Sequence, residues 1–445
     1  MKPTPEVLAT LGDRFSHAVV VWVDEDGYPL SVATDFETDP ERGVVKLRAV
    51  GGVEVQPPED EQVNVVFSHI RPQPGIGYDE RRYVSLWGML DREDGEFVLT
   101  PERELRWDEE EVSFFEFSER GVPQARRYFE NLSAETGREV RPKLAPGWLF
   151  LRATRLPFLT ATIAPIGLGI AIAAYRHGFN WWACVLTLIG GAAIHLGINV
   201  FNDVFDTQSG ADAANVNPTQ FSGGSRVILY GLVPMRWMTW LAIACYAVGI
   251  GIGLVLCATR GWNLLWLGLV GALIGVFYTA PPLRLVHRGL GELAVAAGFG
   301  PIMALGAYFA QAKQYDLEPA LASLPVAILI ALVLYVNEVP DRPADAAAGK
   351  RTLPVRFSKQ TIILLYDAAV AAAFALVLAL AVGRVTPWST LVALLAAPLA
   401  WPVDRALRAH YDSPYELMPA MGKNIQLHLA TGMLLILGYV IAIAV

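Results

Sequence analysis

Nine apolar segments of near-spanning length follow one another along the last two thirds of the sequence. A hydrocarbon core about 30 Å thick is crossed by roughly 20 apolar residues in a helix. We therefore predict an all-α transmembrane bundle of about nine helices within residues 148–445. The segments cover about residues 154–175, 180–205, 236–258, 262–280, 290–312, 319–339, 361–382, 388–404 and 425–444.

Charge is divided unevenly between the two parts of the chain. Residues 1–150 carry 30 acidic and 17 basic side chains, a net of −13, whereas residues 151–445 carry 13 and 18, a net of +5. This division predicts an acidic soluble domain over residues 1–145, joined to a membrane domain over residues 148–445. The negative charge of the first domain argues against nucleic acid as a partner.

The basic residues of the membrane part predict its orientation. Met1 to Asp13 contains no apolar run for a cleavable signal peptide, so we expect the first domain to stay in the cytoplasm. With that orientation, the connections on the cytoplasmic side contain twelve Lys and Arg and the opposite connections four. The positive-inside rule then predicts a multi-pass protein of the cell inner membrane with a cytoplasmic N-terminal domain.

The first domain reads as several strands followed by helical sequence. Residues 17–23 and 28–34 form a predicted hairpin across an Asp-Gly turn, and Thr100-Pro101-Glu102 has the features of a helix start. From there a helical, acidic pattern runs to about Leu132. Strands in meander order followed by helices suggest a small α+β barrel. Further strands are expected at 44–50, 63–70, 83–90 and 97–100.

The strand order of the first domain is similar to that of a known family. The runs VVVWVDEDGYPLSVAT, VVKLRA and RRYVSLWGML resemble the split β-barrel domains of the pyridoxamine-phosphate-oxidase-like family, which often bind FMN or a related flavin. The resemblance implies a soluble α+β split β-barrel. It also implies Lys46, Arg48, Arg81 and Arg82 as phosphate contacts. The alternative is that these four cations are solvated strand ends and the barrel is a scaffold.

Two short acidic stretches stand out in the apolar part. From residue 151 onward there are 13 Asp and Glu, and six lie in these stretches. A charge in mid-bilayer costs roughly 2.5–3.5 kcal/mol on insertion scales, so the carboxylates need a partner. Side chains three or four residues apart share one helix face. Oxygen ligands on two helices suit Mg²⁺ bridging to a diphosphate. The stretches are Asn202, Asp203 and Asp206 with Asp212, and Asn337, Glu338 and Asp341 with Asp345.

Basic and small residues follow both acidic stretches on the predicted cytoplasmic side. Ser222–Arg226 offers backbone amides and a guanidinium, and Lys350 with Arg351 follows the second stretch. Between them, a connection bounded by Tyr278 and Arg284 adds a phenol and a cation. Such groups bind diphosphate oxygens. Within the second stretch, Pro340 and Pro343 predict a local break in the helix.

The motifs NDVFDTQSGAD, YTAPPLRLVHRGLGE and NEVPDRPADAAAGKRTLPVRF, in this order, resemble the UbiA superfamily of membrane prenyltransferases. The resemblance implies a bundle of nine helices that moves a polyprenyl group from its diphosphate to an aromatic or other lipophilic acceptor. The position of Asp212 is most similar to that in the dihydroxynaphthoate prenyltransferases of menaquinone synthesis. The implied metal positions are Asn202, Asp203, Asp206, Asp212, Asn337, Asp341 and Asp345, and the implied catalytic residues are Asp206, Asp341, Lys350, Arg351, Arg284 and Tyr278.

Other functions stay open at this stage. A transporter or a lipid-binding protein also places polar residues at helix breaks. A flavin-dependent reductase tethered to the membrane would place the chemistry in the first domain instead. Asp367 either orients the acceptor or pairs with a neighbour. His195 either lines the cavity with Asn199 or forms a hydrogen bond between helices, and His428 reads as structural.

Overall fold

The computed structural model describes residues 5–23, 29–48, 62–72, 78–138, 140, 144–210, 215, 219, 221–279 and 281–445. The chain divides into two compact units, residues 1–118 and 119–445. The boundary falls inside helix α2 (Phe114–Thr136), whereas the division made from sequence falls after it, at residues 145–148. Each unit is described by itself.

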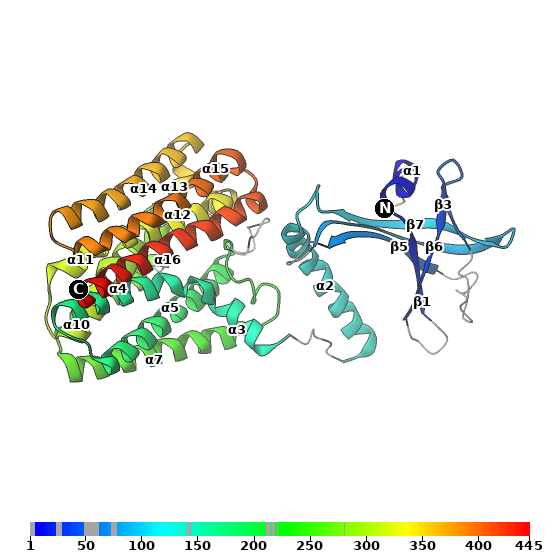
Figure 1. Ribbon diagram of the computed structural model, residues 1–445. Helices are drawn as coiled ribbons and strands as arrows, with labels where there is room; N and C mark the ends of the chain where they lie inside the picture. Colours follow the sequence, from blue (N-terminus) through cyan, green and yellow to red (C-terminus); the bar gives the residue numbers. More distant parts are fainter. Residues whose placement is uncertain are drawn as a thin grey trace. The chain divides into compact units, whose positions relative to one another are not determined.

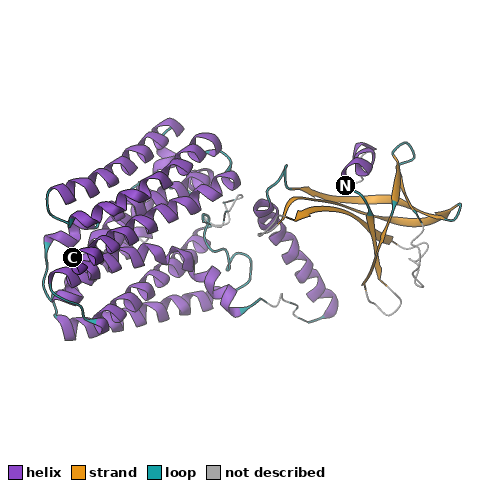
Figure 2. Cartoon of the chain, viewed as in Figure 1, coloured by secondary structure: helices purple, strands orange, loops and turns teal. Residues whose placement is uncertain are grey.

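The first unit is built on one antiparallel sheet (Figures 1 and 2). The strand order is β2-β1-β5-β6-β7-β4-β3, and helix α1 (Pro5–Arg14) precedes the first strand. The sheet is confirmed, and the class of split barrel stays a prediction, since the pairing of the described strands runs from β2 to β3 without closing. The strands are β1 (Ala18–Val23), β2 (Pro29–Thr34), β3 (Phe36–Asp39), β4 (Val44–Leu47), β5 (Gln62–Pro72), β6 (Tyr78–Glu93) and β7 (Glu96–Asp108).

The strand pairing of the predicted hairpin is confirmed, with Val23 opposite Pro29, and its Asp-Gly turn lies outside the described residues. Buried and more exposed side chains alternate along the strands, as expected for a sheet with one face on a core. Val20 and Trp22 of β1 are buried, as are Val65 and Phe67 of β5. Leu8 and Leu11 of α1 pack against this core and are 2% and 1% exposed. A regular hydrophobic core therefore stabilises the first unit.

The helix predicted from Thr100 is wrong, because Thr100 to Asp108 continues β7. Pro101 cannot donate a ladder hydrogen bond, and proline is tolerated where a strand has an open edge. β4 pairs with β7 only as far as Leu99, so β7 has one neighbour, β6, from Thr100 onward. Opposite Pro101 lies Gly88, where a Cβ atom would stand 2.0 Å from the Thr100 carbonyl oxygen. Glycine and proline together allow this close approach.

The second unit is helical (Figure 2). Most of its helices are apolar over their length, as burial in a bundle or a bilayer requires. Their bounds are α3 (Pro146–Thr154), η1 (Leu156–Leu159), α4 (Thr160–Arg176), α5 (Trp181–Ser209), α7 (Met235–Arg260), α8 (Leu264–Thr279), η2 (Leu285–Arg288), α9 (Gly291–Ala297), η3 (Gly298–Ile302), α10 (Met303–Ala312), α11 (Leu317–Ala322), α12 (Leu324–Ala347), α13 (Leu353–Arg356), α14 (Lys359–Val382), η4 (Trp388–Leu399), α15 (Ala400–His410) and α16 (Pro414–Ala444).

Seven stretches in the described part of the chain are long and apolar enough to cross a membrane, rather than the nine predicted. The other two predicted spans are helices of 17 and 16 residues, α4 and α8, which are shorter than a typical span. The seven are Trp181–Gln208, Met235–Arg260, Gly291–Ala312, Leu317–Ala347, Lys359–Val382, Trp388–His410 and Pro414–Ala444. A multi-pass membrane protein follows from these lengths and compositions.

Helix α12 departs from the prediction in a way that matters for the site. Pro340 and Pro343 lie inside the helix, which continues to Ala347 without the predicted break. Their missing N–H groups deprive the carbonyls of Val336 and Val339 of a helical donor. The helix is nevertheless held by burial, since Val336 and Val339 are 0% and 1% exposed in the largest core of the unit. The whole second acidic stretch therefore lies on one helix.

Candidate active site

The first acidic stretch ends helix α5. The side chain of Asn180 caps the start of this helix by accepting from the Ala183 amide, and Gly210 ends it with φ of 79°. Asn202, Asp203 and Asp206 therefore occupy its last two turns, as predicted. Asp203 is buried and Asp206 is largely buried. Asp212 lies outside the described residues.

The second acidic stretch lies along α12. Asn337, Asp341 and Asp345 repeat at a spacing of four, so they share one face of this helix, as the sequence predicts. Asn337 and Asp345 are each 8% exposed. The oxygens of this stretch are therefore presented from a rigid helical row rather than from a flexible loop.

One lysine joins the two stretches. The Lys350 Nζ atom lies 3.8 Å from Oδ1 of Asp206 and 3.4 Å from Oδ1 of Asp345. A turn with Gly349 at φ of 74° leads to Lys350, whose amide donates to the Asp345 carbonyl. Burial lowers the pKa of Lys350, but the carboxylates of Asp206 and Asp345 outweigh it, and the pKa is raised overall. The ammonium thus remains charged between carboxylates of two helices.

The loop after α5 also joins the two stretches. The Gly223 amide donates to Asp341 at 3.1 Å, and the Ser225 amide donates to both carboxylate oxygens of Asp203 at 3.2 Å. The Asn215 side chain donates to the other oxygen of Asp341 at 2.7 Å. Arg226 in turn donates to the backbone carbonyls of Gly223 and Asn215. These donors orient carboxylates from α5 and α12 toward a common loop.

Two amide oxygens in the site are buried and have no hydrogen-bond partner among the described residues. They are Oδ1 of Asn202 on α5 and Oδ1 of Asn337 on α12. A buried acceptor without a partner costs about 1–3 kcal/mol, so these atoms point to a ligand that supplies positive charge or a donor. Within the described ranges, no three His, Cys, Asp or Glu side chains are close enough to hold a metal by themselves. Mg²⁺ fits such a donor set, because it usually takes one or two carboxylates and completes its shell with water and substrate phosphates.

The remaining predicted residues lie around this centre. Tyr278 is at the end of α8 and interacts electrostatically with Asp206, Glu338 and Glu292. Arg284 and Arg351 are both exposed. The Arg351 amide donates to the carbonyl of His287, which ties the two basic connections together. The structure thus brings the basic connections to the same end of the unit without burying their guanidinium groups.

Sequence reasoning missed two residues at this site, Arg155 and Glu292. Arg155, which has φ of 52° between α3 and η1, interacts electrostatically with Asp203 and Tyr278. Glu292 of α9 adjoins Glu338 of α12, and each has a buried oxygen without a partner among the described residues. Pro157, two residues after Arg155, is the sequence signal for a chain break near this cation.

Asp367, His195 and Asn199, whose roles the sequence left open, have structural partners. Asp367 pairs with Arg408 at 2.6 Å, which supports the alternative of a neighbouring ion pair. The His195 ring shares a hydrogen bond of 2.7 Å with Thr162, so the predicted bond between helices is confirmed. Asn199 donates to the carbonyl of Thr154.

The four cations of the first unit do not converge. Lys46 of β4 lies opposite Val98 of β7, whereas Arg82 of β6 lies opposite Asp108, ten residues further along the same strand. At about 3.3 Å per residue that separation is roughly 30 Å. Arg48 pairs with Glu37 at 3.4 Å, and Arg81 pairs with Glu109. A pocket beside Arg82 has a volume of about 10 Å³, enough for one water molecule.

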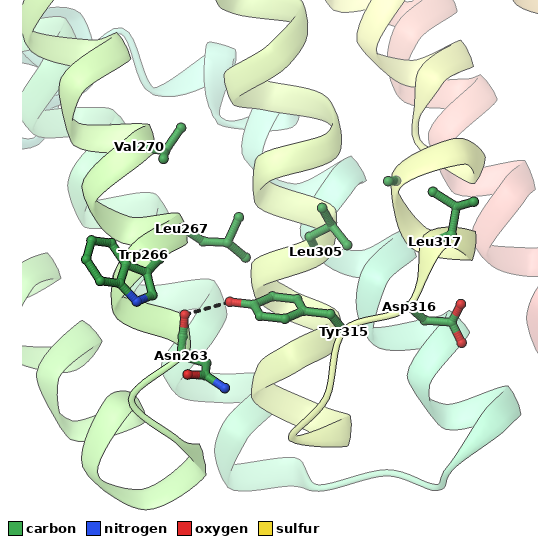
Figure 3. A pocket seen from close by; sticks show the side chains of 9 residues that line it. Asn263, Trp266, Leu267, Val270, Leu305, Tyr315, Asp316 and Leu317 are labelled. Carbon is green, nitrogen blue, oxygen red and sulfur yellow. Dashed lines mark hydrogen bonds between the residues drawn. The ribbon is translucent and has the colours of Figure 1, made fainter.

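A groove of the second unit lies away from the acidic stretches. It has a volume of about 610 Å³ between α8, α10 and α11, and its lining includes Trp266, Leu267, Leu305 and Leu317 (Figure 3). Tyr315 closes one end by donating to the Asn263 carbonyl at 2.7 Å. Trp266 precedes Tyr278 by twelve residues, about 18 Å along α8. The groove is lined mainly by apolar side chains, so it is not a candidate for the chemistry.

The seven candidate spans define a membrane protein. Its polar site, where the acidic faces of α5 and α12 meet, presents oxygens that suit a cation. The sequence profile of the UbiA prenyltransferase family matches residues 162–421, more than half of the chain. The chain therefore belongs to the UbiA prenyltransferase family, and it is a prenyltransferase.

Named relatives agree with this family. The 1,4-dihydroxy-2-naphthoate octaprenyltransferase of Bacillus subtilis is 27% identical over 69% of this chain and 96% of the relative. The enzyme of the same name from Mycobacterium tuberculosis is 34% identical over 54% of this chain and 80% of the relative. The 2-carboxy-1,4-naphthoquinone phytyltransferase of Synechocystis is 27% identical over 67% of this chain and 95% of the relative. A solved UbiA homologue from Aeropyrum pernix has a TM-score of 0.48 at 18% identity, covering 63% of this chain and 97% of that one.

Proposed function

We propose that this chain transfers a polyprenyl group from its diphosphate to an aromatic quinone precursor of naphthoate or naphthoquinone type. The observation that carries the proposal is the position of Lys350 between Asp206 and Asp345, which brings two acidic helix faces to one centre. The names of the relatives in Bacillus and Synechocystis support the class of acceptor.

The oxygens of the two helix faces are the proposed Mg²⁺ ligands. Asn202 and Asp206 contribute from α5, and Asn337, Asp341 and Asp345 contribute from α12. Asp203, which accepts two contacts from the Ser225 amide, orients the loop beside them. When bound, Mg²⁺ neutralises the diphosphate and makes it a better leaving group.

The basic residues at the ends of the connections hold the diphosphate. Lys350 donates to the diphosphate from inside the site, and Arg284 and Arg351 close over it from the exposed connections. The bond between the allylic carbon and the diphosphate oxygen breaks, and its electron pair leaves with the diphosphate. The electron-rich ring carbon of the acceptor then bonds to the allylic carbon, and the proton displaced from that carbon passes to the released diphosphate. The Tyr278 ring can stabilise the allylic cation by roughly 0.5–2 kcal/mol.

The proposed orientation places the acidic stretches on the cytoplasmic side of the inner membrane. It rests on the excess of Lys and Arg in the connections that share a side with Asp206 and Asp341. The lipid bilayer is then both the solvent of the helices and the source of the lipophilic substrates.

The finer assignment of the first unit also remains a proposal. A split barrel of the pyridoxamine-phosphate-oxidase-like kind, with FMN or a related flavin, follows from the resemblance of its strand order. Titration of the purified full chain with FMN, followed by flavin fluorescence, tests it. Quenching that saturates at one flavin per chain supports the cofactor, and fluorescence equal to that of free FMN contradicts it.

The transferase proposal is tested with membranes containing the full chain. Labelled polyprenyl diphosphates are incubated with a panel of hydroxylated aromatic acceptors, with and without a chelator. We expect a Mg²⁺-dependent product that is lost in Asp206→Ala and Asp341→Ala and kept in Glu416→Gln, a control at an exposed carboxylate. Product formation by either alanine variant at the wild-type rate would refute the metal assignment. A product formed only with a non-aromatic lipid would refute the acceptor class.

A further inference from the structure

A half-buried ionic contact lies at the edge of the proposed site, and the reaction described above does not use it. Glu119, the first residue of the second unit, accepts from the Tyr230 hydroxyl at 2.7 Å and from Arg152 at 3.4 Å. The side chains of Glu119 and Arg152 are only 18% and 27% exposed. Burial and then the bond to Glu119 raise the pKa of Tyr230 to about 12, so the phenol keeps its proton and remains a donor.

Arg152 also contacts the loop from Gly223 to Tyr230, which follows the first acidic stretch. Its Nε atom donates to the Ser225 carbonyl at 3.0 Å, while its guanidinium lies over the rings of Trp148 and Tyr230 at 5.5 and 5.6 Å. A planar guanidinium fixed by a carboxylate, a carbonyl and two rings has little freedom to reorient. The position of Ser225 is therefore set from the side of Glu119.

Ser225 connects this contact to the acidic stretches. Its amide donates to Asp203, and the Gly223 amide two residues earlier donates to Asp341. A continuous series of contacts thus leads from Glu119 through Arg152 and Ser225 to a carboxylate of α5.

Helix α2 contacts the same loop at a second point. Arg126 follows Glu119 by seven residues, which places both on one face of the helix. Its Nη1 atom donates to the Leu229 carbonyl at 2.9 Å. Two contacts, two turns apart, hold Leu229 and Tyr230 against α2.

We propose that Glu119 is a positioning residue for the transferase site. Through Arg152 it holds the loop from Gly223 to Tyr230 so that the amides of Gly223 and Ser225 keep Asp341 and Asp203 oriented for Mg²⁺ and diphosphate. This inference rests on the proposed function. It gives α2, the helix that connects the two units in the chain, a direct role in the order of the site.

The first test is hydrogen exchange of the full chain in detergent, without substrate or Mg²⁺. We expect Glu119→Ala to speed exchange of the Gly223 and Ser225 amides about fivefold, the effect of losing one net hydrogen bond. Glu135→Ala removes an exposed carboxylate from the same helix and serves as the matched control. Loop exchange in Glu119→Ala equal to that in Glu135→Ala would overturn the proposal.

A milder variant keeps the test decisive if Glu119→Ala unfolds. Tyr230→Phe deletes only the hydroxyl that donates to Glu119, and we expect it to speed exchange in the loop while leaving exchange in α14 and α16 unchanged. Wild-type exchange in the loop of Tyr230→Phe would contradict the proposed contact.

The kinetic readout separates positioning from general stability. In Glu119→Ala, we expect the Mg²⁺ concentration for half-maximal transfer to rise about fivefold, with kcat at saturating Mg²⁺ changed less than about twofold. Glu119→Gln keeps an oxygen acceptor, so its half-maximal Mg²⁺ concentration should lie between those of the wild type and Glu119→Ala. A faster-exchanging loop with an unchanged Mg²⁺ requirement would overturn the positioning role. It would leave the proposed function to be tested by Asp206→Ala and Asp341→Ala.

Discussion

The ammonium group of Lys350 lies 3.8 Å from the carboxylate of Asp206, although the two residues are 144 positions apart in the sequence. Asp206 lies in the last turn of α5, and Lys350 follows α12. The Lys350 ammonium also lies 3.4 Å from the carboxylate of Asp345. An isolated carboxylate at such a depth would be costly, so the lysine stabilises both. The same cation is placed to contact a diphosphate once metal ions neutralise the carboxylates.

Replacing Lys350 by methionine should remove the charge that joins the two helices. We expect kcat/KM for the polyprenyl diphosphate to fall about 100-fold, equivalent to roughly 2.7 kcal/mol. Lys350→Arg should keep part of the activity because it keeps the charge, and Lys423→Met, at an exposed position, should keep all of it. Steady-state transfer assays with labelled donor measure this. Full activity in Lys350→Met would show that Lys350 takes no part in transfer.

His287 should make the protein acid-sensitive. Burial, and then the charges of Lys350 and Arg284, lower the pKa of His287 in the folded state. The unfolded state therefore binds more protons below about pH 6.5, and the free energy of unfolding falls as the pH drops through that range. We expect His287→Gln to reduce the loss of melting temperature between about pH 7.5 and 5.5, in detergent. An equal loss in both proteins would show that His287 does not contribute.

The far end of the membrane unit should affect stability but not catalysis. Glu318 is 6% exposed and accepts from Arg176 at 2.7 Å and from the Tyr439 hydroxyl at 2.9 Å. Glu318→Ala leaves both donors without this acceptor and should destabilise the bundle by about 3 kcal/mol. Tyr439→Phe should cost about 1 kcal/mol. Thermal unfolding measures both, and KM for the donor should be unchanged. A large change in KM would connect this end to the substrate.

Gly88 should be essential to the sheet of the first unit. An added Cβ atom would stand 2.0 Å from the Thr100 carbonyl oxygen, so the strands must separate to accept any side chain. We expect Gly88→Ala to destabilise the sheet by about 2 kcal/mol or more. Proteolysis of the full chain, followed at β6 and β7, measures the loss. Wild-type resistance would show that the strands adapt without cost.

The sequence was sufficient for features that depend on residue pattern. Apolar segments predicted the helices, and the spacing of Asn337, Asp341 and Asp345 predicted their shared face, because helical periodicity alone determines both. The helix predicted at Thr100 failed for a tertiary reason. Pro101 is tolerated in β7 only because β4 ends beside Leu99, and no local pattern reveals where a neighbouring strand stops.

The carboxylates that the loop between the acidic stretches contacts could not be predicted. Gly223 and Ser225 act through backbone amides, which every residue except proline possesses, so their sequence gives no sign of the carboxylates they contact. Glu119 and Arg152 meet across 33 residues, and only the fold brings them together. Contacts between residues far apart in the sequence are therefore the part of the site that the sequence does not reveal.

The most direct test of a site shared by α5 and α12 is the binding of Mn²⁺, measured by electron paramagnetic resonance in the presence of a non-hydrolysable prenyl thiodiphosphate. If carboxylates of both helices hold the metal and the diphosphate, then Asp206→Asn and Asp341→Asn should each weaken Mn²⁺ binding. The double variant should lose less than the sum of the two effects. Wild-type Mn²⁺ affinity in either single variant would show that one of the helices takes no part in the site.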